Sequence, residues 1–213
     1  MLHALDAPPA PAASTGRASA VSEHRADAEL AARAAAGDRA AQRELFHSLR
    51  GRVHATLYRV LGSNEHMEDL LQDAFIEIFR SLGSYRGEAL LRTWADRVAA
   101  RVAFHHLRRL PRRIRTSNET PPPAVVASTE EASLHREGLA RLYRVLERLS
   151  PEQRVSFALF EIDGRSLEEV AEVTGVSVVA AKNRVARARH KVWDAARRDP
   201  VLAGYLGEEV EAR

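Results

Sequence analysis

Apolar residues spaced three or four apart dominate the sequence, in runs too long for β-strands. The first two stripes are Leu45, Phe46, Leu49, Val53, Leu57, Val60 and Leu61, then Met67, Leu70, Leu71, Phe75, Ile78, Phe79 and Leu82. A third, in residues 88–110, comprises Leu91, Trp94, Val98, Val102 and Leu107. This spacing puts side chains on one face of an α-helix. Because no segment alternates in the way a strand does, the chain is predicted to be all-α.

Proline divides this helical pattern into two predicted domains. Residues 27–110 form the first helical domain and residues 133–199 the second. Between them, residues 111–132 include Pro121–Pro123 and show no helical periodicity. Such a composition is typical of a flexible linker between domains.

The two ends of the chain lack the helical pattern. Residues 1–26 are rich in Ala, Pro and Ser, so they are expected to form a disordered tail, and residues 200–213 a C-terminal tail. The chain begins without a basic leader, and no run approaches the roughly 18 apolar residues of a membrane helix, so no membrane insertion is expected. The absence of cysteine fits a reducing cytoplasm.

Charge and motif content favour binding over catalysis. The chain has 32 Lys+Arg and a net charge of +3, with a pI of about 9.7. Arginine binds phosphates and guanine edges in pairs of hydrogen bonds, but it also accumulates in high-GC genomes, so composition alone does not decide. No phosphate loop, GxSxG or HExxH motif is present, so neither an enzyme nor a cofactor is predicted. His105 and His106 point about 100° apart on a helix, so no metal site is predicted.

Residues 150–193 carry the pattern of two helices joined by a tight turn. Ser166 is a predicted cap of the first helix, Gly175 suits the left-handed turn that ends it, and Ser177 caps the second. The second helix and its cap present groups that can reach phosphates and base edges: Ser177, Lys182, Asn183, Arg184, Arg187 and Arg189. The pattern predicts a DNA-binding helix-turn-helix; an ordinary hairpin with a basic, solvated face is the alternative.

This segment resembles the fourth conserved region of the sigma-seventy family of RNA polymerase subunits. The family reads LG-[IV]-S, T-V-K-S-R and R-A-R, and this chain reads TGVS, AAKNR and RAR. Residues 37–109 resemble the family's second region through GDRAAQRELF, EDLLQDAFIEIFRSLGSYRG, RTWADRVA and LRR. The middle promoter-reading domain of larger members is missing, which is the layout of the extracytoplasmic-function (ECF) group. The resemblance implies a sigma factor that binds the clamp and flap of core RNA polymerase, directs it to promoters and promotes DNA melting.

The resemblance also implies a polymerase-docking helix. In the family, an acidic-apolar helix of the second region contacts the clamp, which here implicates Asp69, Leu70, Gln72, Asp73 and Phe75. Asp69 and Asp73 are four residues apart and share a helical face with Gln72 beside it, as a basic partner requires. From the residues alone, the alternative is a solvated face with Leu70 and Phe75 in the core.

A segment rich in arginine is the candidate for holding melted DNA. Seven arginines and no acidic residue lie between Arg97 and Arg115. In the family, a loop here takes a flipped base of the minus-ten element and the following helix tracks the strand, which helps to open the duplex. The implied residues are Ser84, Tyr85, Arg86, Gly87, Trp94, Arg97, Arg101, His105, Arg108 and Arg109. From the residues alone, a nonspecific electrostatic patch is the alternative. For the helix-turn-helix, the resemblance implies binding to the minus-thirty-five element.

Some positions depart from the usual family residues. Leu91 replaces an aromatic residue, Arg101 an Asn, and His105 an Asp or Asn, which leaves the preferred minus-ten base open. Val178–Ala181 replace a more polar stretch, so fewer hydrogen bonds to DNA are expected there. Methyl contacts to thymine from Ala180 or the valines are the expected substitute.

Two other functions are compatible with a helix-turn-helix. The chain could be a conventional transcriptional regulator, or a sigma mimic that only sequesters an anti-sigma factor. A regulator would need a dimer interface that the first domain does not suggest, and a mimic should have lost its basic residues. An anti-sigma factor that clamps between the two domains is an expected partner of a sigma factor.

Overall fold

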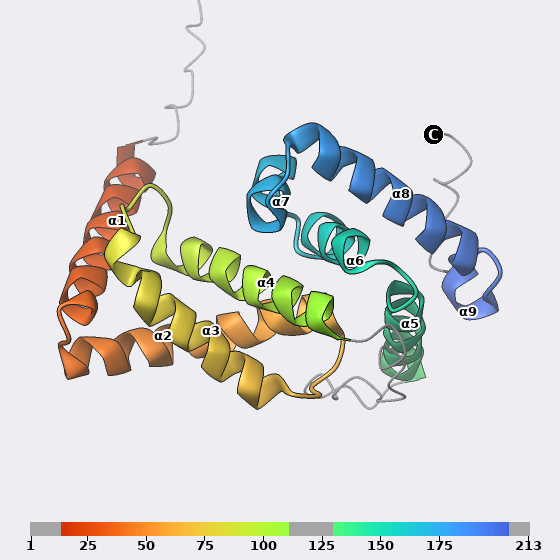
Figure 1. Cartoon of the computed structure of the whole chain (residues 1–213), viewed down its shortest axis with the longest axis horizontal. Helices are drawn as coiled ribbons and strands as arrows, with labels where there is room; N and C mark the ends of the chain where they lie inside the picture. Colours follow the sequence, from red (N-terminus) through yellow and green to blue (C-terminus); the bar gives the residue numbers. More distant parts are fainter. Residues whose placement is uncertain (1–13, 111–129, 205–213) are drawn as a thin grey trace, which may run out of the picture.

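The computed structural model describes residues 14–110 and 130–204, and every regular element in these ranges is a helix. The first group, drawn in red to green in Figure 1, comprises α1 (Ser14–Ala35), α2 (Arg39–Leu61), α3 (Met67–Ser81), the short 3₁₀ helix η1 (Leu82–Ser84) and α4 (Leu91–Arg109). The second group comprises α5 (Glu130–Leu146), α6 (Pro151–Phe157), the π-helical η2 (Ala158–Ile162), α7 (Leu167–Thr174), α8 (Val178–Ala196) and α9 (Pro200–Ala203). The all-α prediction is confirmed.

Local capping groups fix several helix ends, and those of the helix-turn-helix lie where the sequence predicted them. The Asp38 carboxylate accepts hydrogen bonds from the Ala40 and Ala41 amides at 2.8 and 3.2 Å, which starts α2. Ser166 and Glu169 form a reciprocal capping box at the start of α7. Gly175 ends α7 in the left-handed conformation with φ 66°, and Ser177 caps α8. The helix-turn-helix therefore has the predicted geometry.

The expected N-terminal tail is partly wrong, because α1 begins at Ser14; residues 1–13 lie outside the described part of the chain. The helix is anchored to distant residues. The Leu91 amide donates to the Asp27 carboxylate at 2.7 Å, and Glu23 pairs with Arg92. Composition gave no sign of these contacts, which offset the entropy of ordering an alanine-rich segment.

Other boundaries also differ from expectation. Helix α4 begins at Leu91, whereas the predicted helical segment began at residue 88. The predicted linker lies largely outside the described residues, although its last residues already belong to α5. Helix α9 falls in the predicted C-terminal tail, and Asp199 caps it while pairing with Arg141 at 2.8 Å.

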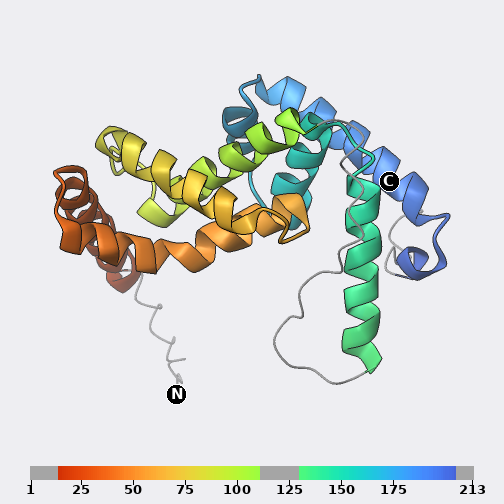
Figure 2. The same ribbon diagram turned by 60° about the horizontal axis from the view of Figure 1, so that its bottom comes forward.

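The two groups of helices pack directly on each other. Helices α6 and α7 lie against α4, as Figure 1 shows, and η2 lies against α2. One continuous apolar cluster includes Val98 and Ala99 of the first group together with Leu159, Val170 and Ala171 of the second. Figure 2 shows α5 standing apart as an arm below this junction. The structure therefore has two helical units with a shared core.

Candidate nucleic-acid and protein interfaces

The outer face of α8 presents most of the groups predicted to contact the minus-thirty-five element. Lys182, Asn183 and Arg187 are exposed, whereas Arg184 is half-buried. Ser177 is exposed and accepts a hydrogen bond from the Ala180 amide at 3.3 Å. Most of the predicted residues therefore lie on the solvent-exposed face of one helix.

Arg189 is an exception among the predicted residues of α8. Its Nε donates to Glu161 at 2.9 Å, and its guanidinium lies 5.6 Å from the centre of the Trp193 ring. In this structure Arg189 therefore stabilises the packing of α8 on η2.

Two valines at the start of α8 remain in solvent. Val179 is 70 % exposed and Val178 40 % exposed, the former more than any other large apolar side chain in the described residues. Exposed methyl groups at the leading end of a helix can contact the thymine methyl in a major groove. The structure thus leaves free the valines that the sequence suggested for such contacts.

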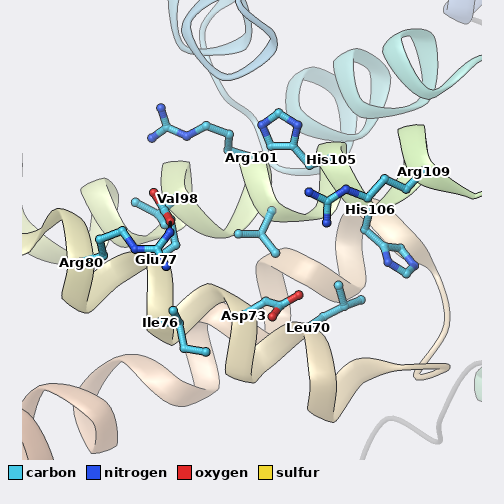
Figure 3. Close-up of a pocket in the computed structure, with 11 residues that line it drawn as sticks. Leu70, Asp73, Ile76, Glu77, Arg80, Val98, Arg101, His105, His106 and Arg109 are labelled. Atoms are coloured by element: carbon cyan, nitrogen blue, oxygen red, sulfur yellow. Dashed lines mark hydrogen bonds and ion pairs between the residues drawn. The ribbon is translucent and has the colours of Figure 1, made fainter.

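The exposed face of α4 carries a row of basic groups. Arg101, His105, Arg108 and Arg109 are exposed, and Figure 3 shows Arg101, His105 and Arg109 along this helix. Arg108 also lies 5.6 Å from the centre of the Phe104 ring. Spacings of four and three residues place Arg101, His105 and Arg108 on one side of the helix.

Arg97 belongs to the same predicted set but is engaged within the chain. It is half-buried, and its guanidinium pairs with Glu172 at 3.2 Å and with Glu169 at 3.4 Å, both on α7. Burial alone would raise the pKa of Glu169, but the Ser166 amide and the neighbouring Arg165 and Arg97 hold that pKa below its ordinary value. The two charges therefore persist as an ion pair at neutral pH.

An aromatic pair joins the predicted base-binding loop to α4. The Tyr85 and Trp94 rings are 5.6 Å apart and half-buried, and the Tyr85 hydroxyl donates to the Ala89 carbonyl at 2.7 Å. Burial, and to a lesser degree Asp27, raises the pKa of Tyr85, so its hydroxyl stays protonated. The other predicted loop residues are Ser84, Arg86 and Gly87. The Ser84 hydroxyl donates to the Ser81 carbonyl, Arg86 is exposed, and Gly87 has a left-handed backbone with φ 72°.

A groove of about 370 Å³ separates α3 from α4 (Figure 3). Asp73 and Glu77 line it on the α3 side and Arg101 and His105 on the α4 side. His106, also in its lining, has a pKa lowered by burial and by nearby His66. Acidic and basic faces thus lie on either side of one groove.

The free face of α3 differs from the predicted docking set. Asp69, Gln72 and Asp73 are exposed as predicted, but Leu70 and Phe75 are buried in the core. Between the polar groups lies an exposed apolar side chain, Ile76, at 46 % exposure. Sequence reasoning missed it, although its position outside the core stripe and four residues after Gln72 was a usable signal.

Within the described residues, no group of three or more His, Asp or Glu side chains is arranged to hold a metal ion. Across residues 14–110 and 130–204, no helix has both the length and the apolar character that a bilayer crossing requires.

Comparison with known proteins places both helical units in one family. Residues 45–113 match the family model for Sigma-70 region 2, and residues 139–192 match that for Sigma-70, region 4. The ECF RNA polymerase sigma factor SigM of Mycobacterium tuberculosis H37Rv is 32 % identical, over 89 % of this chain and 90 % of its own. The ECF RNA polymerase sigma-E factor of Escherichia coli K12 is 29 % identical, over 81 % and 95 %.

A solved structure of CnrH in complex with the cytosolic domain of CnrY is similar in fold. It is 27 % identical with a TM-score of 0.55, and the match covers 82 % of this chain and 99 % of that one. Two helical units of these two types, in this order, define a non-enzymatic transcription initiation factor. The chain belongs to the sigma-70 family, in its ECF group, and is a promoter-specific sigma factor of RNA polymerase.

Proposed function

We propose that this sigma factor divides its work among three helices: α3 docks on the polymerase, α4 holds the melted minus-ten strand, and α8 reads the minus-thirty-five element. The observation that supports this division most directly is the separation of charge. The exposed charged side chains of α3 are the acidic Glu68, Asp69 and Asp73 and one basic group, Arg80, which pairs with Glu77, whereas all those of α4 and α8 are basic.

For docking, the proposed contact surface is Asp69, Gln72, Asp73 and Ile76. An exposed apolar side chain beside acidic groups suits a protein partner with a basic, partly apolar surface, since the apolar contact is desolvated while the acidic groups pair with the partner's charges. Leu70 and Phe75 are proposed to act indirectly. The Phe75 ring packs 4.6 Å from that of Phe46, which fixes how α3 presents its outer face.

For the minus-ten element, Arg101, His105, Arg108 and Arg109 are proposed to follow the phosphates of one DNA strand. Each phosphate contact should release counterions, so binding through this face should weaken steeply with salt. Tyr85 and Trp94 are proposed to support the loop that takes the flipped base. Stacking a base against an aromatic side chain contributes about 1–3 kcal/mol.

For the minus-thirty-five element, Lys182, Asn183 and Arg187 are proposed to contact base edges and phosphates. Val179 is proposed to contact a thymine methyl, since its side chain is highly exposed in the first turn of α8. Arg184 is proposed to join them once its partly buried guanidinium turns outward. The result is a readout that relies more on arginine and methyl contacts than on hydrogen bonds from the first helical turn.

An anti-sigma factor is a further proposed partner. The support is the similar fold of CnrH, which was solved in complex with the cytosolic domain of CnrY. A sigma factor acts together with RNA polymerase, so the proposed place of action is the cytoplasm.

A transcriptional regulator or a sigma mimic would use the same helix-turn-helix differently. A mimic needs no DNA contacts, yet the basic faces of α4 and α8 are both present. A regulator needs no polymerase-docking face, and the exposed Asp69, Asp73 and Ile76 of α3 are proposed to form one. The two observations together favour a sigma factor.

The test is a pair of charge reversals in reconstituted holoenzyme. Asp69→Lys with Asp73→Lys should weaken binding to core polymerase at least tenfold, whereas Arg184→Glu with Arg187→Glu should leave that affinity unchanged. The second variant should instead lose the dependence of initiation on the minus-thirty-five sequence. Equal loss of polymerase binding in both variants would contradict the proposed roles. Arg39→Glu with Arg198→Glu, two exposed residues outside α3, α4 and α8, changes net charge as much as the second variant and is its matched control.

A further inference from the structure

The first turn of α4 has no capping side chain of its own. Its N-cap position is Leu90, which offers no side-chain acceptor, and the amides of Thr93 and Trp94 donate to the Leu90 carbonyl at 2.9 and 3.0 Å. Helix starts are normally completed by a Ser, Thr, Asp or Asn beside them in the chain. Here the Asp27 carboxylate of α1 accepts from the Leu91 amide at 2.7 Å. A residue of a separate helix therefore completes the start of α4.

A second residue of α1 holds the same turn. Glu23 lies four residues before Asp27, so the two side chains share one face of α1. Glu23 pairs with Arg92, the residue that follows Leu91 in α4. Figure 1 shows α1 beside η1 and the start of α4, and α1 contacts both of these helices. Two acidic groups of α1 thus hold the backbone and a side chain at the first two residues of α4.

The same turn of α4 adjoins the predicted base-binding loop, in which residues 85–90 form no regular element. The Tyr85 hydroxyl donates to the Ala89 carbonyl at 2.7 Å, and the Tyr85 ring lies 5.6 Å from that of Trp94. Burial raises the pKa of the Tyr85 hydroxyl, and the charge of Asp27 adds to this rise. Asp27 therefore lies where the loop and the first turn of α4 meet.

The shape of this loop matters because a base must enter it. A loop without regular structure binds tightly only if it is held in the bound shape beforehand, since ordering it during binding costs conformational entropy. The side chains of Arg86 and Glu88 in the loop are exposed. The contacts from α1 hold the far end of the same loop, where it enters α4.

We infer that α1 positions the minus-ten site: Asp27 holds the first turn of α4, so that the loop before it keeps the shape that takes the flipped base. Asp27 is a positioning residue, which acts through α4 and the loop rather than through a contact with DNA. The inference rests on the proposed role of the loop and α4 at the minus-ten element. It also gives a role to Glu23, which lies in the segment predicted to be a disordered tail.

The test uses holoenzyme and a short single-stranded oligonucleotide that carries the minus-ten sequence of a promoter used by the wild type. Otherwise identical oligonucleotides carry an abasic site at each position in turn. The position at which removal of the base weakens binding most marks the flipped base. The ratio of the affinities with and without that base is its base contribution, which stacking predicts to be about tenfold in the wild type.

Asp27→Ala removes the acceptor of the Leu91 amide. This variant should lower the base contribution to about twofold or less, while its affinity for the abasic oligonucleotide changes by less than about twofold. Asp27→Asn keeps an acceptor oxygen at the same reach, so it should restore most of the base contribution. An equal loss of affinity for both oligonucleotides in Asp27→Ala would overturn the inference, because a merely structural role weakens both.

The matched control is Glu29→Ala, which removes one negative charge from an exposed position of the same helix. It should keep the base contribution of the wild type, and a loss equal to that of Asp27→Ala would overturn the inference. If Asp27→Ala is poorly folded by circular dichroism, Glu23→Gln at an exposed residue decides. It should lower the base contribution about twofold, and an unchanged value would overturn the inference.

The wild type separates this inference from the proposed function. If no abasic position weakens binding of the wild-type holoenzyme, the proposed minus-ten role of the loop is refuted, and the inference with it. If the wild type shows a base contribution that Asp27→Ala retains in full, only the positioning role of α1 is refuted.

Discussion

Asp96 shows how a single residue joins the two helical units. Its side chain is 1 % exposed, and its carboxylate accepts from Arg52 at 2.7 Å and from Thr56 at 3.2 Å within the first unit. Arg165 of the second unit supplies a further bond at 2.5 Å. A buried carboxylate is tolerable only when it is paired in this way, because its desolvation is otherwise very unfavourable.

Replacing Asp96→Asn should therefore lower the free energy of unfolding by about 2–4 kcal/mol, because two arginines lose their counter-charge. Urea denaturation followed by circular dichroism measures the change. Asp73→Asn on the exposed face of α3 is the control and should change stability by less than about 0.5 kcal/mol. A loss at Asp96 no larger than at Asp73 would show that the buried pairs add little.

The pKa of Glu169 predicts how the stability of the protein depends on pH. Its pKa is held below the ordinary value of 4.5 despite partial burial, so the folded state favours the carboxylate. The resulting stabilisation is complete above pH 4.5 and is lost as the pH falls through the lower, folded pKa. Stability measured between pH 7 and pH 3 should fall less steeply for Glu169→Gln than for the wild type. Parallel curves for the two proteins would contradict this assignment.

At the scale of helices and turns, two glycines with nearly the same backbone offer a matched comparison. Gly62 ends α2 with φ 68° and Gly175 ends α7 with φ 66°. A Cβ at Gly175 would meet no atom within 4 Å, whereas one at Gly62 would lie 2.1 Å from Cδ1 of Tyr143. The two sites differ in the space beside the turn rather than in the turn itself.

Gly175→Ala should destabilise the protein by about 1–2 kcal/mol, which is the cost of the left-handed backbone alone. Gly62→Ala should lose about 1–3 kcal/mol more, because the Tyr143 ring must move. Thermal unfolding of both variants measures the difference. Equal losses would mean that α5 does not press on the end of α2 in solution.

Local chemistry decides which helix ends can be predicted from sequence. Ser166, Gly175 and Ser177 are caps that act on amides or carbonyls within a few residues, and each was predicted. The start of α4 was not, because its first amide is capped by Asp27, 64 residues earlier in the chain. The π-helical turn of η2 likewise has no local signal in its sequence.

The same division applies to the candidate interfaces. The exposed basic residues of α4 and α8 followed from helical spacing and from the resemblance to the sigma-seventy family. Ile76 was missed because the apolar stripe was read only for the core. Leu70 and Phe75, which the resemblance placed at the polymerase contact, are buried, as in the alternative drawn from the residues alone. Exposure depends on which neighbours cover a helix, and spacing alone does not give that information.

At the scale of the whole molecule, the packing of one unit on the other was outside the reach of sequence reasoning. The linker suggested two independent domains, yet Arg97 faces α7 and the apolar core runs through both units. Such an interface depends on the complementary shape of surfaces far apart in sequence.

The central claim is that this chain directs RNA polymerase to promoters, and in vitro transcription tests it most directly. Core polymerase is mixed with fragmented bacterial genomic DNA, with or without the protein, and transcript starts are mapped. The account predicts a discrete set of starts that appears only with the protein and shares one minus-thirty-five and one minus-ten sequence. Starts that are unchanged by the protein, while it binds core polymerase normally, would contradict it.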